Sequence, residues 1–346
     1  MSRHDGARPR AVVFGCAGTS LTDAERKFYA DADPLGFILF ARNCSDKRQV
    51  TALTADFRMS VGRPEAPVLI DQEGGRVTRL KPPVWRALPA PRRIGSLYGV
   101  DAALGLEAAA LNARLIAADL QELGIDVNCV PVLDVPVPGS NDAVVGDRAF
   151  GGDPLAVAAL GKRACEGCFE GGVLPVIKHF PGHGRATVDS HAALPVVDAP
   201  LDLLRRSDFV PFRALANMPC GMVAHLRLDA VDDRAPASQS ARVIEHVIRG
   251  EFGFDGLLFS DDIGMGALGG SAGARAARTL AAGCDVTLHC SGNFAEMLDV
   301  AANAPPMTDA ALARFARARA ALRAPAPFDR AAGAARLDTL LAQSGA

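Results

Sequence analysis

The chain has 346 residues, 49% of them hydrophobic and 22% charged, and its formal net charge is −2 at pH 7. This is the composition of a globular protein, and the near-neutral charge argues against binding to nucleic acid or a membrane surface, since both require a basic face. The apolar run after the basic residues 1–10 is too short for a signal peptide, and no apolar run reaches the roughly 18 residues of a membrane span. We therefore expect a cytoplasmic protein.

Short apolar runs that predict strands alternate with patterns that predict helices along the whole chain. The predicted strands are residues 11–15, 36–40, 67–70, 125–130, 174–177, 221–224, 256–259 and 285–288. The predicted helices are residues 22–30, 45–61, 101–123, 154–170, 201–216, 238–251, 272–282, 293–302, 308–323 and 329–341.

Eight strands separated mostly by helices favour an α/β fold, a single-domain (β/α)8 barrel of the TIM type whose strands can be irregular. We expect one catalytic domain over residues 1–346, with its core at residues 11–305 and the two helices within residues 308–341 packed outside. A doubly wound open sheet is the alternative. Such a sheet usually has a glycine-rich phosphate turn after its first strand, and Gly15-Cys16-Ala17-Gly18 is not that fingerprint.

Three of the loops that follow predicted strands are long: residues 71–100, 131–152 and 178–200. Loops beyond about 12–15 residues usually carry function. In a barrel these three would meet at the face where active sites lie. The residues that follow the predicted strands are also dense in charged and imidazole groups: Arg42, Asn43, Asp71, Asp134, Lys178, His179, His225, Asp261, Asp262 and His289.

The eight cysteines are scattered, mostly within apolar runs, and we interpret them as reduced and buried. Cys165 and Cys168 form a C-x-x-C pair that could be redox-active or bind a metal. They lie in a predicted helix with no second pair nearby, which favours a structural role.

Residues 178–191 are a polar segment in which a lysine and three histidines follow an apolar run. Asp189 and His191 lie two residues apart, and a carboxylate beside a histidine can fix its tautomer for general acid–base catalysis. A set of His179, His183, His191 and Asp261 could instead bind a metal, although no H-x-H or H-E-x-x-H spacing supports that alternative.

Asp261 and Asp262 are neighbours at the end of a predicted strand. Adjacent side chains on an extended backbone point to opposite faces. We therefore expect one of the two carboxylates to project into a site and the other to bind backbone or an arginine.

These segments together resemble glycoside hydrolase family 3, and most of all its bacterial β-N-acetylglucosaminidases of peptidoglycan recycling. The resemblance covers about residues 11–300 and departs from the family pattern at Gly264-Met265-Gly266 and after the last strand at Cys290-Ser291-Gly292-Asn293. The blocks that carry it are Ile38–Asn43, Asp71–Arg79, Gly146–Phe150, Lys178–Gly184, Asp189–His191, Met222–His225 and Phe259–Met265.

The resemblance implies a retaining exo-hydrolase that releases terminal β-linked N-acetylglucosamine from muropeptide fragments. By matching position, Asp261 would be the nucleophile, and His191, oriented by Asp189, would be the general acid and base. The resemblance assigns sugar binding to Asp71, Arg79, Arg148, Lys178 and His179.

No metal or organic cofactor is implied, and the expected partner is the saccharide or muropeptide substrate of a monomeric enzyme. Two alternatives stay open. A phosphorylase on the same scaffold is one, because a neutral or positive acid–base group tolerates phosphate better than a carboxylate does. An inactive sugar-binding protein is the other.

Overall fold

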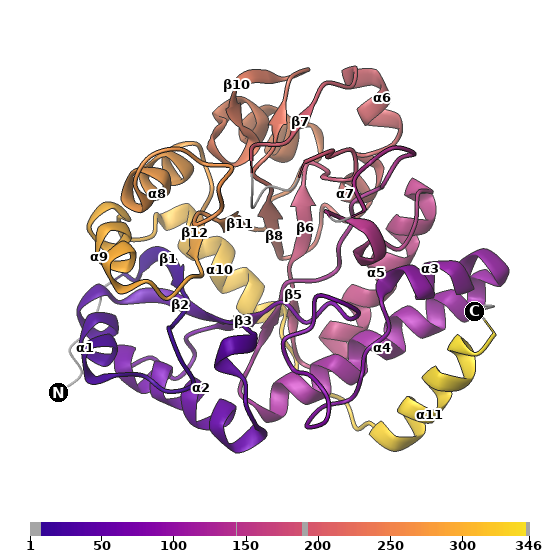
Figure 1. The fold of residues 1–346 in the computed structure, drawn as a ribbon, viewed down its shortest axis with the longest axis horizontal. Coiled ribbons are helices and arrows are strands. Elements are labelled where there is room, and N and C mark those ends of the chain that lie inside the picture. Colours follow the sequence, from indigo (N-terminus) through magenta and orange to yellow (C-terminus); the bar gives the residue numbers. More distant parts are fainter. Residues whose placement is uncertain (1–7, 143, 189–192, 344–346) are drawn as a thin grey trace.

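The computed structural model describes residues 8–142, 144–188 and 193–343, and Figure 1 shows their arrangement. The main sheet of this described part has nine strands in the order β5-β4-β3-β2-β1-β12-β11-β8-β6, and every neighbouring pair is parallel. Its strands are β1 (Arg10–Phe14), β2 (Pro34–Leu39), β3 (Val68–Ile70), β4 (Val127–Asn128), β5 (Leu174–Pro175), β6 (Ile177–Phe180), β8 (Cys220–Val223), β11 (Leu257–Asp262) and β12 (Val286–His289).

The sheet closes where its two end strands, β5 and β6, follow each other along the chain with only Val176 between them. Backbone hydrogen bonds cross the remaining gap, from Lys178 N to Pro131 O at 3.1 Å and from Leu133 N to Lys178 O at 2.6 Å. The predicted (β/α)8 barrel is therefore confirmed. Its fifth predicted strand is two short strands, because Pro175 has no N–H with which to continue the ladder.

Helices surround the barrel on its outside (Figure 1). They are α1 (Asp23–Ala32), α2 (Lys47–Val61), α3 (Pro91–Val100), α4 (Ala102–Glu122), α5 (Pro154–Glu170), α6 (Leu201–Arg206), α7 (Val210–Ala214), η4 (Val243–Glu251), α8 (Ala272–Ala281), α9 (Phe294–Asn303), α10 (Asp309–Ala321) and α11 (Arg330–Leu341), with single turns η1 (Ala41–Asn43), η2 (Gly146–Arg148) and η3 (Ala237–Gln239). Within the described ranges, no helix combines the length and the apolar character that a membrane crossing requires.

Local capping explains where several helices begin. Thr22 accepts a hydrogen bond from the backbone N–H of Glu25, and the Glu25 carboxylate accepts one from the backbone N–H of Thr22, which is a capping box at α1. The Asp101 carboxylate accepts hydrogen bonds from the N–H groups of Ala103 and Leu104 at the start of α4.

The barrel interior is a closed apolar core that leaves only one end open for a site. Every barrel strand contributes to it except β6, with side chains such as Val13, Ile38, Leu69, Met222 and Phe259. Met307, just before α10, and Ala311 and Ala318 on it belong to the same cluster. The segment before α10 also hydrogen-bonds the start of β1, from Ala11 N to Pro305 O, so α10 closes the amino-terminal end of the barrel.

Three predicted segments differ from the structure. The loop predicted at residues 71–100 contains α3, and the single helix predicted at residues 201–216 is divided into α6 and α7, with Pro211 in the first turn of α7. The loop predicted from Lys178 actually begins after Phe180, and it contributes β7 (Val196–Val197) to a small sheet with β9 (Arg227–Leu228) and β10 (Asp232–Pro236).

Candidate active site

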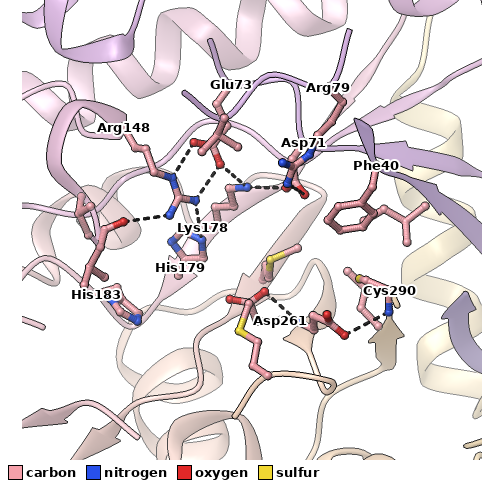
Figure 2. Close-up of a pocket in the computed structure, with 18 of the residues that line it drawn as sticks. Phe40, Asp71, Glu73, Arg79, Arg148, Lys178, His179, His183, Asp261 and Cys290 are labelled. Atoms are coloured by element: carbon pink, nitrogen blue, oxygen red, sulfur yellow. Dashed lines mark hydrogen bonds and ion pairs between the residues drawn. The ribbon is translucent and has the colours of Figure 1, made fainter. Parts of the chain in front are cut away.

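A cavity of about 340 Å³ opens at the carboxyl ends of the barrel strands (Figure 2). It is lined by residues that follow or end β2, β3, β6, β8, β11 and β12, and by η2. All five predicted sugar-binding residues and the predicted nucleophile border it: Asp71, Arg79, Arg148, Lys178, His179 and Asp261. The fold therefore brings together side chains that are up to 190 positions apart in the chain.

One wall of the cavity is a chain of alternating charges. The Lys178 ammonium lies 2.7 Å from Asp71 Oδ1 and 2.7 Å from Glu73 Oε1. Glu73 also accepts two hydrogen bonds from the Arg148 guanidinium, each 2.8 Å long. Figure 2 shows the four side chains side by side along the upper wall. Two cations and two carboxylates neutralise one another in a place where a lone charge would be costly.

This network sets the ionisation of its members. Burial alone raises the pKa of the Glu73 carboxyl, but the charges of Arg148 and Lys178 lower it on balance from 4.5 to about 2. Burial likewise opposes ionisation of Asp71, while Lys178 and Arg79 hold the pKa of Asp71 well below its usual range. Burial disfavours the charged ammonium of Lys178, yet Asp71 and Glu73 raise its pKa. The network is therefore fully ionised at neutral pH.

His179 connects this wall to a deeper carboxylate. His179 Nδ1 lies 2.6 Å from Asp134 Oδ2, and Asp134 has no exposed side-chain surface. The other oxygen of Asp134 accepts a hydrogen bond of 2.7 Å from the backbone N–H of His183, where the loop after β6 begins. The far ring nitrogen, His179 Nε2, lies 3.4 Å from Arg148 Nη2.

Asp261 and Asp262 end β11, and both border the cavity. The pairing of β11 with β12 is irregular between Phe259 and Asp262, and the chain turns at Asp262. As expected, one of the two carboxylates binds backbone N–H groups. Asp262 Oδ1 does accept backbone hydrogen bonds, from Gly264 at 2.9 Å and Cys290 at 3.1 Å. Asp262 therefore ties the end of β11 to the end of β12.

The Asp261 carboxylate remains available to the cavity. Its one hydrogen bond among the described residues is from the backbone N–H of Asp262, at 2.8 Å. Burial raises its pKa, but nearby His179 and His225 and this N–H lower it on balance. His225 also fixes the backbone here, because its Nε2 lies 3.0 Å from Asp262 O. Asp261 is thus an ionised carboxylate on a rigid strand end, able to attack an electrophilic carbon.

Arg79 completes the cavity beside Asp71. Its Nη2 atom lies 3.2 Å from Asp71 Oδ2, and its guanidinium carbon lies 4.7 Å from the centre of the Phe40 ring. The ring and the ion pair together hold the guanidinium at the mouth of the cavity.

Asp189 and His191, the predicted acid–base pair, lie outside the described residues. His183 lies in the cavity wall, and burial lowers its pKa to about 4, so it is neutral at pH 7. Among the described residues, no group of three or more His, Cys, Asp or Glu side chains could hold a metal ion. The alternative metal set includes His191 and stays untested.

The sequence predictions did not assign a role in the site to Glu73, and they noted Asp134 only as a polar strand end. Glu73 lies within the block Asp71–Arg79 that carried the family resemblance, so its position was visible but its partners were not. All eight cysteines are free, and burial raises the pKa of both Cys165 and Cys168, which agrees with the structural role predicted for that pair.

Comparison with known proteins places this barrel and its cavity in a family. Residues 16–317 match the glycosyl hydrolase family 3 N-terminal domain. A β-hexosaminidase of Stenotrophomonas maltophilia strain R551-3 is 39% identical over 297 residues, which are 85% of this chain and 86% of that protein. A β-hexosaminidase of Bordetella avium is 36% identical over 321 residues, or 92% of this chain and 90% of that protein.

The fold is shared with solved structures as well. NagZ from Neisseria gonorrhoeae, crystallised in complex with N-trifluoroacetyl-D-glucosamine, superposes with a TM-score of 0.87 at 32% identity. The match covers 96% of this chain and 98% of that one. The chain therefore belongs to glycosyl hydrolase family 3, as its sequence motifs predicted, and it is a glycoside hydrolase.

Proposed function

We propose that the protein is a retaining exo-β-N-acetylglucosaminidase that removes terminal β-linked N-acetylglucosamine from muropeptide fragments during peptidoglycan recycling. The observation that carries the proposal is Asp261, an ionised carboxylate on a strand end that faces a cavity of about 340 Å³ lined with charged donors and acceptors. A β-hexosaminidase activity agrees with the names of the relatives and with the sugar ligand of the Neisseria structure.

The reaction would run in two steps at one carbon atom. Asp261 attacks the anomeric carbon, the bond to the leaving oxygen breaks, and His191 donates a proton to that oxygen. In the second step His191, now neutral, takes a proton from water, and the water oxygen attacks the same carbon and releases Asp261. Two inversions retain the β configuration. Asp189 would hold the His191 ring in position.

The charged wall would bind the sugar in its ionised form. The Asp71 carboxylate can accept hydrogen bonds from sugar hydroxyls, and Arg79 and Arg148 can donate to sugar oxygens. Lys178 has three N–H donors, of which Asp71 and Glu73 use two, so one remains for the ligand. Lys178 would therefore act mainly by fixing Asp71, with a single direct contact to the sugar.

The test is hydrolysis of a chromogenic β-N-acetylglucosaminide by the wild type and by Asp261→Ala. We expect turnover by the wild type and a loss of at least about 10³-fold in the variant, because removing a covalent nucleophile removes the reaction path. Asp262→Ala is the matched control for the neighbouring carboxylate, and it should still form the covalent intermediate. A wild type that binds the sugar without turnover, even at high enzyme concentration, would overturn the proposal.

The same assay separates hydrolysis from phosphorolysis. We expect the rate to be independent of inorganic phosphate and free N-acetylglucosamine to be the only sugar product. Formation of N-acetylglucosamine 1-phosphate in phosphate buffer would assign the protein to the phosphorylases instead. Release of N-acetylglucosamine from an anhydro-muramyl peptide fragment would support the muropeptide substrate. We propose a monomeric cytoplasmic enzyme, which sedimentation of the purified protein and fractionation of cells can test.

A further inference from the structure

The buried carboxylate of Asp134 holds two parts of the site in place at once. Its Oδ2 lies 2.6 Å from His179 Nδ1, on β6. Its Oδ1 accepts backbone hydrogen bonds from His183 at 2.7 Å and from His179 at 3.4 Å. Asp134 itself is outside the cavity lining, so it can act on a bound sugar only through the groups that it holds.

Two neighbours together fix which nitrogen of His179 carries a hydrogen. Burial raises the pKa of Asp134, but its contacts with His179 and His183, including the hydrogen bonds that it accepts from them, lower the pKa on balance to about 2, so its carboxylate can only accept. His179 Nδ1 must therefore be the donor in the 2.6 Å contact. On the other side of the ring, the Arg148 guanidinium has only donors, and it lies 3.4 Å from His179 Nε2.

That second contact is long for a hydrogen bond, but it is too short for two N–H groups to face each other without repulsion. His179 Nε2 is therefore the acceptor. Both contacts select the same form of the ring, which is neutral with its hydrogen on Nδ1. Figure 2 shows the ring of His179 between Arg148 and His183 at the cavity wall.

We propose that Asp134 is a positioning residue that holds His179 as the neutral Nδ1–H tautomer, so that Nε2 accepts a hydrogen bond from a hydroxyl group of the sugar. This inference rests on the proposed function for the identity of the ligand. It assigns a direction to the contact: the sugar donates and the protein accepts. The substrate must therefore present a hydrogen-bond donor, such as a hydroxyl group, to His179 Nε2, and a group that cannot donate should bind more weakly.

Fluorine tests this rule, since it replaces a hydroxyl at similar size but cannot donate. We expect one of the 3-, 4- and 6-deoxyfluoro analogues of N-acetylglucosamine to bind the wild type about 10-fold to 100-fold more weakly than the parent sugar, as a lost donor leaves a buried acceptor unpaired. Isothermal titration calorimetry on the whole protein gives the dissociation constants. A profile in which all three analogues bind as well as the parent sugar would overturn the proposal.

Asp134→Asn is the variant that reverses the tautomer. The new carboxamide would keep its oxygen toward the backbone N–H groups of His183 and His179, because those donors hold Oδ1 of Asp134 in the wild type. The NH2 group of the carboxamide then faces His179 Nδ1 and must donate to it. The ring hydrogen moves to Nε2, and His179 presents a donor to the cavity. One fluoro analogue is expected to bind the wild type more weakly than the parent sugar does. For that analogue, the ratio of its dissociation constant to that of the parent sugar should be at least about 5-fold smaller in Asp134→Asn than in the wild type.

The tautomer can be measured without any sugar. Nitrogen-15 NMR of protein labelled at histidine distinguishes an Nδ1–H ring from an Nε2–H ring and from the doubly protonated form, and the His179→Gln variant assigns the signal. We expect Nδ1–H in the wild type and Nε2–H in Asp134→Asn. An Nε2–H or doubly protonated His179 in the wild type at pH 7 would overturn the proposal by itself, even if Asp134→Asn failed to fold.

Asp285→Asn is the matched control, because Asp285 is also buried and ion-paired but lies just before β12, at the closed end of the barrel. It should leave the His179 signal and the fluoro-analogue profile unchanged. A control that shifts both as Asp134→Asn does would show that loss of any buried carboxylate suffices, and would count against the proposal. If the wild type bound none of these sugars, the proposed function would fail, while the NMR result would still decide the tautomer.

Discussion

Replacing Glu73 by Gln tests the idea that the charged wall of the cavity is a stability element as well as a binding surface. The Glu73 side chain is 1% exposed and that of Lys178 is 2% exposed, so solvent cannot take over when the carboxylate is removed. Lys178 keeps Asp71, but Arg148 loses both of its hydrogen bonds to a charged acceptor.

The size of the effect follows from the pKa of Glu73. The difference between 4.5 and about 2 corresponds to about 3 kcal/mol in favour of the folded state when Glu73 is ionised. Breaking a buried ion pair by removing one partner costs about 3–5 kcal/mol, which agrees. Because the pKa of Glu73 is lower in the folded than in the unfolded chain, this contribution is complete above pH 4.5 and is lost as the pH falls toward 2.

Urea unfolding of the wild type and of Glu73→Gln, followed by circular dichroism, measures this contribution. We expect the free energy of unfolding of the variant to be about 3 kcal/mol lower than that of the wild type at pH 7. At pH 4 this difference between the two proteins should be smaller by roughly 1 kcal/mol. Glu107→Gln is the control, because Glu107 is an exposed partner of Arg336 and should cost less than about 1 kcal/mol. A Glu73→Gln variant as stable as the wild type, or a gap that does not depend on pH, would refute the reasoning.

Three further predictions concern the helix ends, the loop after β6 and the cofactor requirement. Asp101→Ala should lower the free energy of unfolding by about 1 kcal/mol, since it removes the acceptor for two N–H groups at the start of α4, and Asp101→Asn should recover most of the loss in the same urea titration. Gly184→Ala should lower kcat/KM by about 10-fold to 100-fold, because a Cβ there would lie 2.0 Å from Val135 O and push the loop away, whereas Gly99→Ala, with no atom within 4 Å, should leave the rate unchanged. Incubation with a chelator should leave hydrolysis of the chromogenic substrate unaffected, and a loss that added zinc restores would instead favour the metal alternative.

The strand periodicity and the polar strand ends were enough to predict the barrel and the position of its open face. Asp71 follows an apolar run directly and Asp261 follows one after a single serine, and parallel strands bring such positions to one end. Local sequence patterns were sufficient here, because an apolar run is itself the strand that it predicts and a capping residue lies at the start of its helix. The family motifs then assigned a role to six of the residues that line the cavity, but not to Glu73.

The ion pairs and hydrogen bonds among the side chains of the cavity could not be predicted in the same way. Lys178 was predicted to begin a loop, but it lies within β6 and is neutralised by Asp71 and Glu73, more than one hundred positions earlier in the chain. The residues next to Lys178 in the sequence do not indicate an ion-pair partner that lies so far away in the chain. The link from Asp134 to His179 spans 45 positions and was invisible for the same reason.

The missed helix α3 has a different cause. Its sequence contains Gly95 and Gly99, which weaken a helical pattern. The structure shows why one of them is needed: a Cβ on Gly95 would lie 1.6 Å from Phe150 O, so only glycine allows α3 to approach that segment. The tertiary contact outweighs the helical propensity, and sequence periodicity alone does not reveal it.

The anomeric configuration of the first sugar released tests the central claim, that Asp261 acts as a nucleophile in a double displacement. Proton NMR during early hydrolysis of a β-N-acetylglucosaminide by the wild type distinguishes the two anomers before they interconvert. Our account predicts that β-N-acetylglucosamine appears first, with the α anomer growing in only by mutarotation. Initial release of the α anomer would mean a single displacement by water, and it would contradict the role of Asp261.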